Sequence, residues 1–220
     1  MKVSEKSLEL NVGAELLTWL RGPMHMPKAY LRGLTQREEN KSGVDFFTQL
    51  PSDIRIFAFQ FKAPRGPRDN SPYKFTLNRE QHGHLHQLAK QAPNAVFYVL
   101  PFYVLTDKLI RDVPHLARDT WFLPVAPMDV TTVFSGQRTK QVRCHPGIAY
   151  VNPEFEMKNL LDLMLSWEDG IKPSYFADWY QELRRHNQEM NDRRSRMSPM
   201  IVRGLRVALI KQNGRGEIAI

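Results

Sequence analysis

Residues 54–62 are the segment that most constrains the fold of this chain. They read IRIFAFQFK, are rich in aromatic and β-branched residues, and are followed by Pro64, so they predict a strand that ends near position 62. Side chains alternate along a strand, which places Gln60 and Lys62 on one face and three phenylalanines on the other. Polar residues at the end of an otherwise apolar strand predict a functional site at its C-terminal end.

The rest of the first 152 residues predicts helices and strands in alternation. Residues 4–21 have apolar side chains at helical spacing and stop at Gly22-Pro23, and Asn78 is a typical helix cap. This order predicts an α/β fold with a mixed central sheet flanked by helices. The expected elements are helices 4–21, 78–91 and 106–118, and strands 43–47, 54–62, 73–77, 95–100 and 121–125.

The remainder, residues 153–220, predicts a helical, basic C-terminal extension packed on or following the core. Residues 155–167 and 174–186 are expected to form helices, 187–198 a polar linker, and 201–210 a late strand or an apolar tail. This tail is also one possible dimer interface.

The net charge of the chain is +8, with 31 Lys and Arg against 23 Asp and Glu. Residues 184–220 hold nine basic and three acidic side chains, so they supply most of this excess. A basic chain of this kind predicts an anionic partner, most simply nucleic acid. The residues expected to contact phosphates are Arg65, Arg68, Lys74, Arg193, Arg194 and Arg196.

Cys144 is the single cysteine, so no internal disulfide can form. No apolar run approaches the roughly 20 residues of a membrane helix, and the first residues lack the apolar segment of a signal peptide. We therefore expect a cytoplasmic protein with no membrane partner.

Two carboxylates stand in unusual positions. Glu9 falls near the centre of the apolar face of helix 4–21, where a charge is costly unless it is paired, protonated or bound to a cation. Alternatively, the helix begins later and Glu9 only caps it. Glu15 lies near the edge of that face and is expected to be solvated. Asp45 lies in an apolar strand, where it either accepts turn hydrogen bonds or belongs to a site.

Together these side chains predict a site for a divalent cation and a phosphate. Glu9 and Asp45 would supply hard oxygen ligands for Mg²⁺ or Mn²⁺, and the Gln60 side-chain oxygen or a nearby backbone carbonyl would complete the shell. Lys62 would lie beside the scissile phosphate, where it would either polarise the attacking water or stabilise negative charge as the bond breaks.

This succession resembles the restriction-endonuclease-like PD-(D/E)XK nuclease superfamily. Glu9 on the first helix, Asp45 on a strand and Gln60-Phe61-Lys62 on the next strand correspond to its motif. The resemblance covers roughly the first half of the chain. It departs from the common pattern at position 60, which has Gln instead of Asp or Glu, and at Val44, which stands where a Pro is frequent.

The resemblance implies a Mg²⁺-dependent DNA endonuclease in genome defence, mobile-element biology or repair. Glu9, Asp45 and Gln60 would hold the metal and Lys62 would be the catalytic lysine, while Gln81, His84 or His86 could line the cleft. A homodimer or a larger defence or repair complex is expected, because small nucleases that cut both strands usually act as dimers. Two alternatives are a non-catalytic nucleic-acid-binding or partner-binding protein of the same fold, and an enzyme with the same chemistry on RNA.

Overall fold

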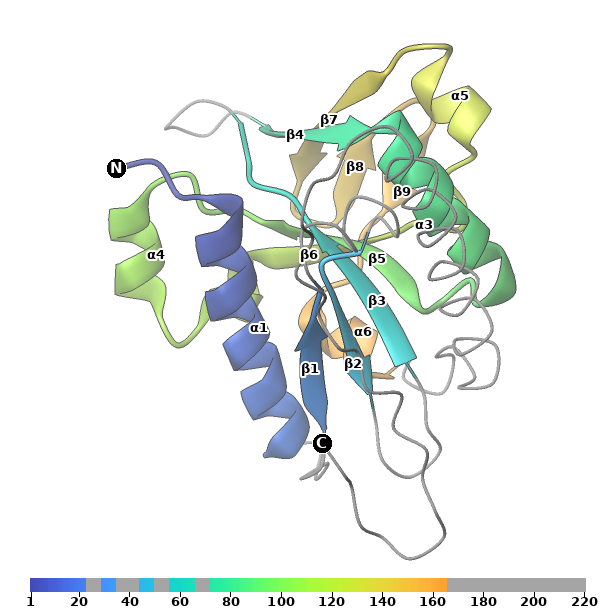
Figure 1. Ribbon diagram of the computed structural model, residues 1–220. Coiled ribbons are helices and arrows are strands. Elements are labelled where there is room, and N and C mark those ends of the chain that lie inside the picture. The colour runs from blue at the N-terminus through green and yellow to red at the C-terminus, as the bar shows by residue number, and fades with distance from the viewer. Residues whose placement is uncertain (23–28, 35–43, 50–55, 66–71, 166–220) are drawn as a thin grey trace, which may run out of the picture. The chain divides into compact units, whose positions relative to one another are not determined.

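The computed structural model describes residues 1–22, 29–34, 44–49, 56–65 and 72–165, which form a mixed α/β fold with two sheets (Figure 1). Helix α1 (Glu5–Arg21) starts after Ser4, whose hydroxyl accepts a hydrogen bond from the Ser7 N–H at 3.0 Å. It ends where the Gly22 N–H donates to the Thr18 carbonyl. No helix in these described ranges is long and apolar enough to cross a membrane.

The first sheet has five strands in the order β1-β2-β3-β5-β6. Strands β1, β2 and β3 pair antiparallel, β5 runs parallel to β3, and β6 is antiparallel to β5. The register between β2 and β3 pairs Phe46 with Phe59, so Asp45, just before β2, lies opposite Gln60. The strands are β1 (Tyr30–Gly33), β2 (Phe46–Gln49), β3 (Ile56–Phe61), β5 (Val96–Pro101) and β6 (Thr120–Pro124).

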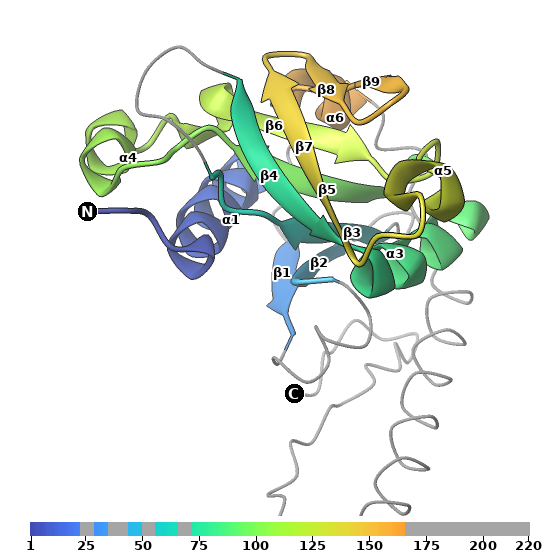
Figure 2. The same cartoon turned by 90° about the horizontal axis from the view of Figure 1, so that it is seen from above.

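The second sheet is antiparallel in the order β4-β7-β8-β9, and Figure 2 shows β4 and β7 crossing over β5 and β6. The ring of Tyr73 in β4 stacks on that of Phe102 with centroids 4.2 Å apart, and the ring of Phe75 is tilted against Phe102 at 6.0 Å. Backbone hydrogen bonds of 2.8 Å between Phe122 and Lys158 join β6 to the segment after β9. The strands are β4 (Tyr73–Asn78), β7 (Thr139–His145), β8 (Ile148–Tyr150) and β9 (Glu154–Glu156).

The hydrophobic core lies between these sheets and their helices. All six residues of β5 are buried, which explains why its sequence shows no alternation. Helix α1 packs on β1 and β3, and α3 packs against β4 and β5. The remaining helices are α3 (Arg79–Gln91), α4 (Thr106–Asp112), the short 3-10 helix η1 (Leu116–Asp119), α5 (Val130–Phe134) and α6 (Leu160–Leu165).

Several of the helices and strands predicted from the sequence are confirmed, and two predicted helices have different bounds. Helices α1 and α3, including the Asn78 cap, and strands β3 to β6 lie where the sequence predicts them. The helix expected over 106–118 is confirmed at its start but is too long: α4 begins at Thr106 and ends at Asp112, and Pro114, which cannot donate a backbone hydrogen bond, separates it from η1. The helix expected over 155–167 is wrong at its start, because Glu154–Glu156 pairs with β8 as a strand and α6 begins at Leu160.

Most of the predictions for the C-terminal part of the chain concern residues that the structure does not describe. The expected boundary at 152/153 lies between β8 and β9, which are neighbours in one sheet. The expected elements 174–186, 187–198 and 201–210 lie outside the described residues. The basic extension therefore stays a prediction.

Glu15 was expected to be solvated, but its side chain is buried. Its carboxylate accepts hydrogen bonds from the Leu116 and Ala117 N–H groups at 2.6 and 3.1 Å. These are backbone donors at the start of η1 that have no partner within that helix. Burial raises the pKa of Glu15, and the two N–H groups oppose this rise. The residue therefore fastens α1 to η1.

We expect Glu15→Ala to lower the free energy of unfolding by about 2–4 kcal/mol, because it leaves two buried N–H groups without an acceptor. Urea unfolding of the full chain measures the loss. Glu15→Gln is the matched variant: it keeps one acceptor oxygen and should lose roughly half as much. Equal stability of Glu15→Ala and the native chain would contradict the bridging role.

Candidate metal and phosphate site

Asp45 is the most deeply placed carboxylate of the predicted site, with 4% of its surface exposed. Its N–H donates to the carbonyl of Phe59 at 2.8 Å, although Phe59 is the register partner of Phe46, so the backbone departs from the regular β2–β3 ladder at Asp45. Because directly opposite residues of an antiparallel pair share a face, the Asp45 side chain meets that of Gln60. The sheet register thus brings together two residues that are 15 positions apart.

Three oxygen atoms converge on the Gln60 side-chain nitrogen. Gln60 Nε2 donates to both Asp45 carboxylate oxygens at 2.8 Å and to the Phe61 carbonyl at 3.0 Å. The Phe61 N–H also donates to the Asp45 carboxylate. Gln60 Oε1 accepts a hydrogen bond from Gln81 Nε2 of α3 at 2.7 Å, so α3 holds the amide from the other side.

The Asp45 carboxyl group binds its proton unusually tightly. Burial raises its pKa to about 7, opposed by the Lys62 ammonium and the Phe61 N–H and reinforced by the Glu5 and Glu9 carboxylates. This folded-state pKa exceeds the ordinary value of 3.8, so the folded protein holds the proton at pH values where the unfolded chain has lost it. The resulting stabilisation is fully present below the ordinary pKa and is lost as the pH rises through about 7.

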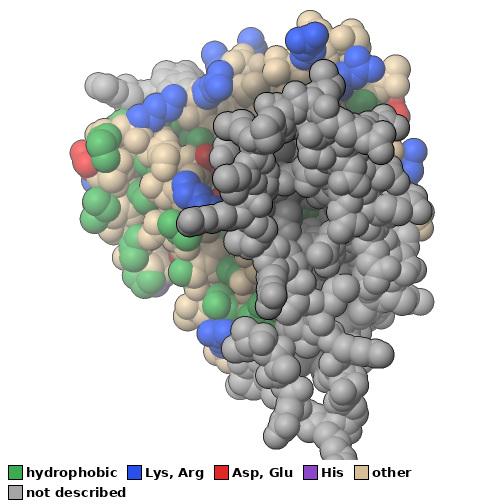
Figure 3. All heavy atoms as spheres, viewed as in Figure 1, with side chains coloured by type: hydrophobic (Ala, Val, Ile, Leu, Met, Phe, Trp, Pro, Cys, Tyr) green, Lys and Arg blue, Asp and Glu red, His purple; other side chains and the backbone are tan. Residues whose placement is uncertain are grey.

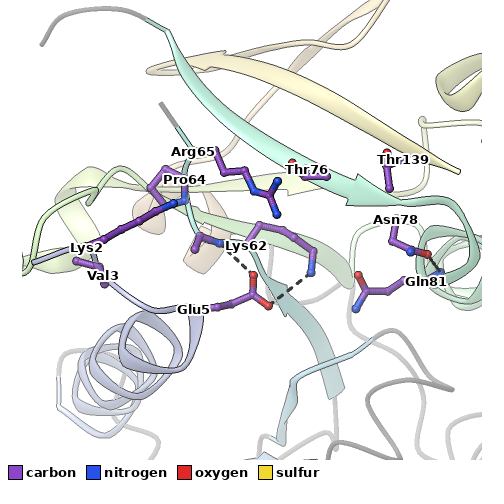
Figure 4. A pocket seen from close by; sticks show the side chains of 11 residues that line it. Lys2, Val3, Glu5, Lys62, Pro64, Arg65, Thr76, Asn78, Gln81 and Thr139 are labelled. Atoms are coloured by element: carbon purple, nitrogen blue, oxygen red, sulfur yellow. Dashed lines mark hydrogen bonds and ion pairs between the residues drawn. The ribbon is translucent and has the colours of Figure 1, made fainter. Parts of the chain in front are cut away.

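Lys62 lies at the opening of this buried cluster, where it meets Glu5. The Lys62 Nζ is 3.7 Å from Glu5 Oε1, and Glu5 Oε2 accepts a hydrogen bond from the Ala63 N–H at 3.1 Å (Figure 4). The Lys62 N–H donates to the Val99 carbonyl at 3.1 Å, which fixes its backbone to β5. Glu5 was not predicted as a site residue, because an acidic residue in the first turn of a helix is explained by the helix dipole alone.

Glu9 is buried, as its place on the apolar face of α1 predicts, and it is paired with Lys6 at 2.7 Å. The alternative that the helix begins later and Glu9 caps it is wrong, because α1 starts at Glu5. Glu9 is close enough to Asp45 to raise its pKa. The structure therefore brings two α1 carboxylates, Glu5 and Glu9, into the electrostatic field of Asp45.

A pocket of about 400 Å³ opens beside Lys62. In Figure 4 the Arg65 side chain reaches into the space between Lys62 and Thr76. Of the helix residues that the resemblance suggests for a cleft, Gln81 lines this pocket. The lining residues are Lys2, Val3, Glu5, Lys62, Ala63, Pro64, Arg65, Thr76, Asn78, Gln81 and Thr139.

Two of the six residues predicted to contact phosphates, Arg65 and Lys74, lie in the described part of the chain. The Arg65 N–H donates to the Lys74 carbonyl, so these two residues lie side by side at the edge of β4. The other predicted contacts lie outside the described residues: Arg68, Arg193, Arg194 and Arg196.

No three His, Cys, Asp or Glu side chains converge on one point in the part of the chain that the structure describes. The oxygens that do converge come from one carboxylate, Asp45, and one backbone carbonyl, that of Phe61. Such a set contains only hard oxygen donors, the kind that Mg²⁺ and Mn²⁺ prefer. If both side-chain amides, those of Gln60 and Gln81, rotated by half a turn, the Gln60 oxygen would join this set of oxygens. The Gln60 nitrogen would then donate to the Gln81 oxygen, which keeps a hydrogen bond between the two glutamines.

Comparisons of the chain with protein-family models, with curated proteins and with solved structures found no match. The geometry around Asp45, Gln60 and Lys62 is therefore the basis for assigning a chemistry to this site.

Proposed function

We propose that the protein is a metal-dependent endonuclease that hydrolyses phosphodiester bonds in DNA. The observation that supports this most directly is the convergence of the Asp45 and Phe61 oxygens on the Gln60 side-chain amide, with Lys62 beside it in the wall of a pocket. An oxygen cluster can bind a divalent cation, and an adjacent ammonium can bind the phosphate to be cut.

The order of the elements supports the same proposal. Helix α1, the antiparallel strands β1, β2 and β3, helix α3 and the parallel neighbour β5 follow the order of the restriction-endonuclease-like core. Strand β4 is an addition between β3 and α3 that pairs with β7 of the second sheet. The proposed ligands Asp45 and Gln60 lie at the start of β2 and near the end of β3, the places that the resemblance implies.

The proposed ligands of Mg²⁺ or Mn²⁺ are Asp45, Gln60 and the Phe61 carbonyl, with Glu9 or Glu5 from α1. A bound divalent cation would lower the pKa of its water and neutralise charge on the phosphoryl oxygens. The pKa of Asp45, about 7, fits this role, since its carboxylate becomes a better ligand as it loses its proton.

The chain's own residues would then orient the substrate. Lys62 is held by Glu5 in the free protein, and its ammonium would donate to a phosphate oxygen in place of that long ion pair. Arg65, in the same pocket, would bind a neighbouring phosphate and fix the register of the strand. Gln81 would keep the Gln60 amide oriented.

The test is cleavage of linear, supercoiled and branched DNA and of RNA by the full chain, with Mg²⁺, with Mn²⁺ or with EDTA. Cutting that needs the cation and is lost with EDTA supports the nuclease, and the preferred substrate separates DNA from RNA. Absence of cutting on every substrate, together with no Mg²⁺ or Mn²⁺ binding by calorimetry, would overturn the proposal.

One observation favours the non-catalytic alternative. The Gln60 amide already satisfies the Asp45 and Phe61 oxygens without any cation. A binding protein of this fold would keep a hydrogen-bonded network of this kind. It would bind nucleic acid equally well in EDTA, and this separates it from a nuclease whose substrate is also held through the metal.

A further inference from the structure

The second sheet has one mainly polar face, with Ile148 as an exposed aliphatic residue on it, and this face runs on from the proposed catalytic pocket. Residues paired across an antiparallel sheet share a face, and the buried Phe75, Leu77 and Val142 point to the other side. The polar face includes Thr76 and Thr139, which line the pocket beside Lys62. It is therefore continuous with the place where the proposed chemistry occurs.

A row of cross-strand partners crosses this face from basic to acidic. Lys74 of β4 pairs with Arg143 of β7, which pairs with Tyr150 of β8, which pairs with Glu154 of β9. Strands β4 and β7 contain no acidic residue. Neither Lys74 nor Arg143 forms an ion pair with any other described residue. Figure 3 shows Lys and Arg side chains along the upper border of the view, where Figure 1 places β4 and β7.

Aromatic rings stand next to these basic groups. Tyr150 is 39% exposed, and its ring is perpendicular to that of His145 with centroids 5.7 Å apart. Exposed rings beside arginine and lysine on a sheet are the arrangement on which proteins stack unpaired bases. In duplex DNA the base faces are covered by their neighbours, so such rings would have little to bind.

We propose that a single-stranded segment of nucleic acid binds along this face and leads into the pocket at Lys62. Arg143, Lys74 and Arg65 bind its phosphates, and Tyr150 stacks on a base. Glu154, the acidic end of the row, repels phosphate and marks the limit of the track. Only the direction of the strand towards Lys62 rests on the proposed nuclease; the binding itself does not.

The experiment measures binding of the full chain, in EDTA, to a fluorescein-labelled single strand of about 20 nucleotides and to its duplex. We expect Tyr150→Ala to weaken single-strand binding about tenfold and to leave duplex binding unchanged, while Tyr150→Phe keeps the native affinity. We expect Arg143→Ala to weaken single-strand binding and to reduce the slope of log affinity against log salt by about 0.7.

The matched controls are Trp19→Ala, an aromatic side chain that is 41% exposed on α1, and Arg118→Ala, an exposed arginine on η1. Both should bind the single strand as the native chain does, and thermal melting monitored by circular dichroism shows whether each variant is folded. Native single-strand affinity in folded Tyr150→Ala and Arg143→Ala would overturn the proposal, as would an equal loss for the duplex.

The outcome is separable from that of the nuclease. If the Tyr150 and Arg143 variants lose single-strand binding but the native chain cuts nothing, the binding face stands and the catalytic proposal fails. If the native chain cuts with Mg²⁺ and these variants bind and cut normally, the nuclease stands and the binding face is wrong.

Discussion

Lys62→Met is expected to reduce metal-dependent cleavage about 100- to 1,000-fold while DNA binding changes little. In the proposed nuclease the lost ammonium would stabilise the negative charge that develops on the phosphate, and removing one preorganised donor of this kind has effects of this size. Methionine keeps most of the apolar stem of Lys62, which is 8% exposed, so packing against the pocket wall is retained. Single-turnover cleavage at saturating Mg²⁺ measures the change.

The control for Lys62→Met is Lys90→Met, which removes an exposed ammonium from the end of α3. It should cut at the native rate, because the substitution changes the net charge equally without touching the site. If Lys62→Met cuts within about threefold of the native rate, the ammonium does not act in the chemical step. A loss in both variants would indicate an effect of overall charge.

Gln60→Glu is expected to make the folded protein depend on a divalent cation. In EDTA the new carboxylate faces that of Asp45 in a buried place, and the hydrogen bonds from Gln60 Nε2 to the Asp45 and Phe61 oxygens are lost. We expect a fall of about 3 kcal/mol in the free energy of unfolding at pH 8. The fall should be smaller at pH 6, since the pKa of Asp45 is about 7 and its carboxyl group is then largely protonated.

Mg²⁺ should restore this stability, because the cation is attracted to two carboxylates more strongly than to one. Cation binding at about a hundred times its Kd adds about 2.7 kcal/mol to the stability of a folded protein. Urea unfolding at both pH values, with Mg²⁺ and with EDTA, measures the effect. Gln91→Glu on the exposed end of α3 is the control and should respond to neither condition. A Gln60→Glu variant that Mg²⁺ does not stabilise would argue against a cation site.

Local patterns were sufficient to predict part of this fold. Strand β3 and helix α3 were predictable because each has a strong local sequence pattern and one clear boundary. Pro64 follows the end of β3, and Asn78 caps the start of α3. Strands β7 and β8 were not predicted, because β7 has only Val142 and Cys144 as alternating apolar residues and β8 is three residues long. The outward-facing residues of these two strands contribute to the proposed binding surface.

Several individual residues of the site could be predicted from the sequence, but the contacts that they make with residues of α1 and α3 could not. Asp45, Gln60 and Lys62 were conspicuous as polar residues in apolar surroundings, and the structure brings Asp45 and Gln60 into direct contact. The hydrogen bond from Gln81 and the ion pair with Glu5 depend on how α3 and α1 pack on the sheet, which no local pattern specifies. Glu15 was misplaced for the same reason, since its partners are about a hundred residues away.

The pairing of β4 with β7 has a consequence for the order in which the protein folds during synthesis. Asn78 pairs with Thr139 and Tyr73 with Cys144, so β4 emerges from the ribosome long before its partner strand. Pairing so distant in sequence closes late, after β3, α3 and β5 have been made. Because Thr139 completes the pocket wall, a nascent chain would have no finished pocket until β7 is released.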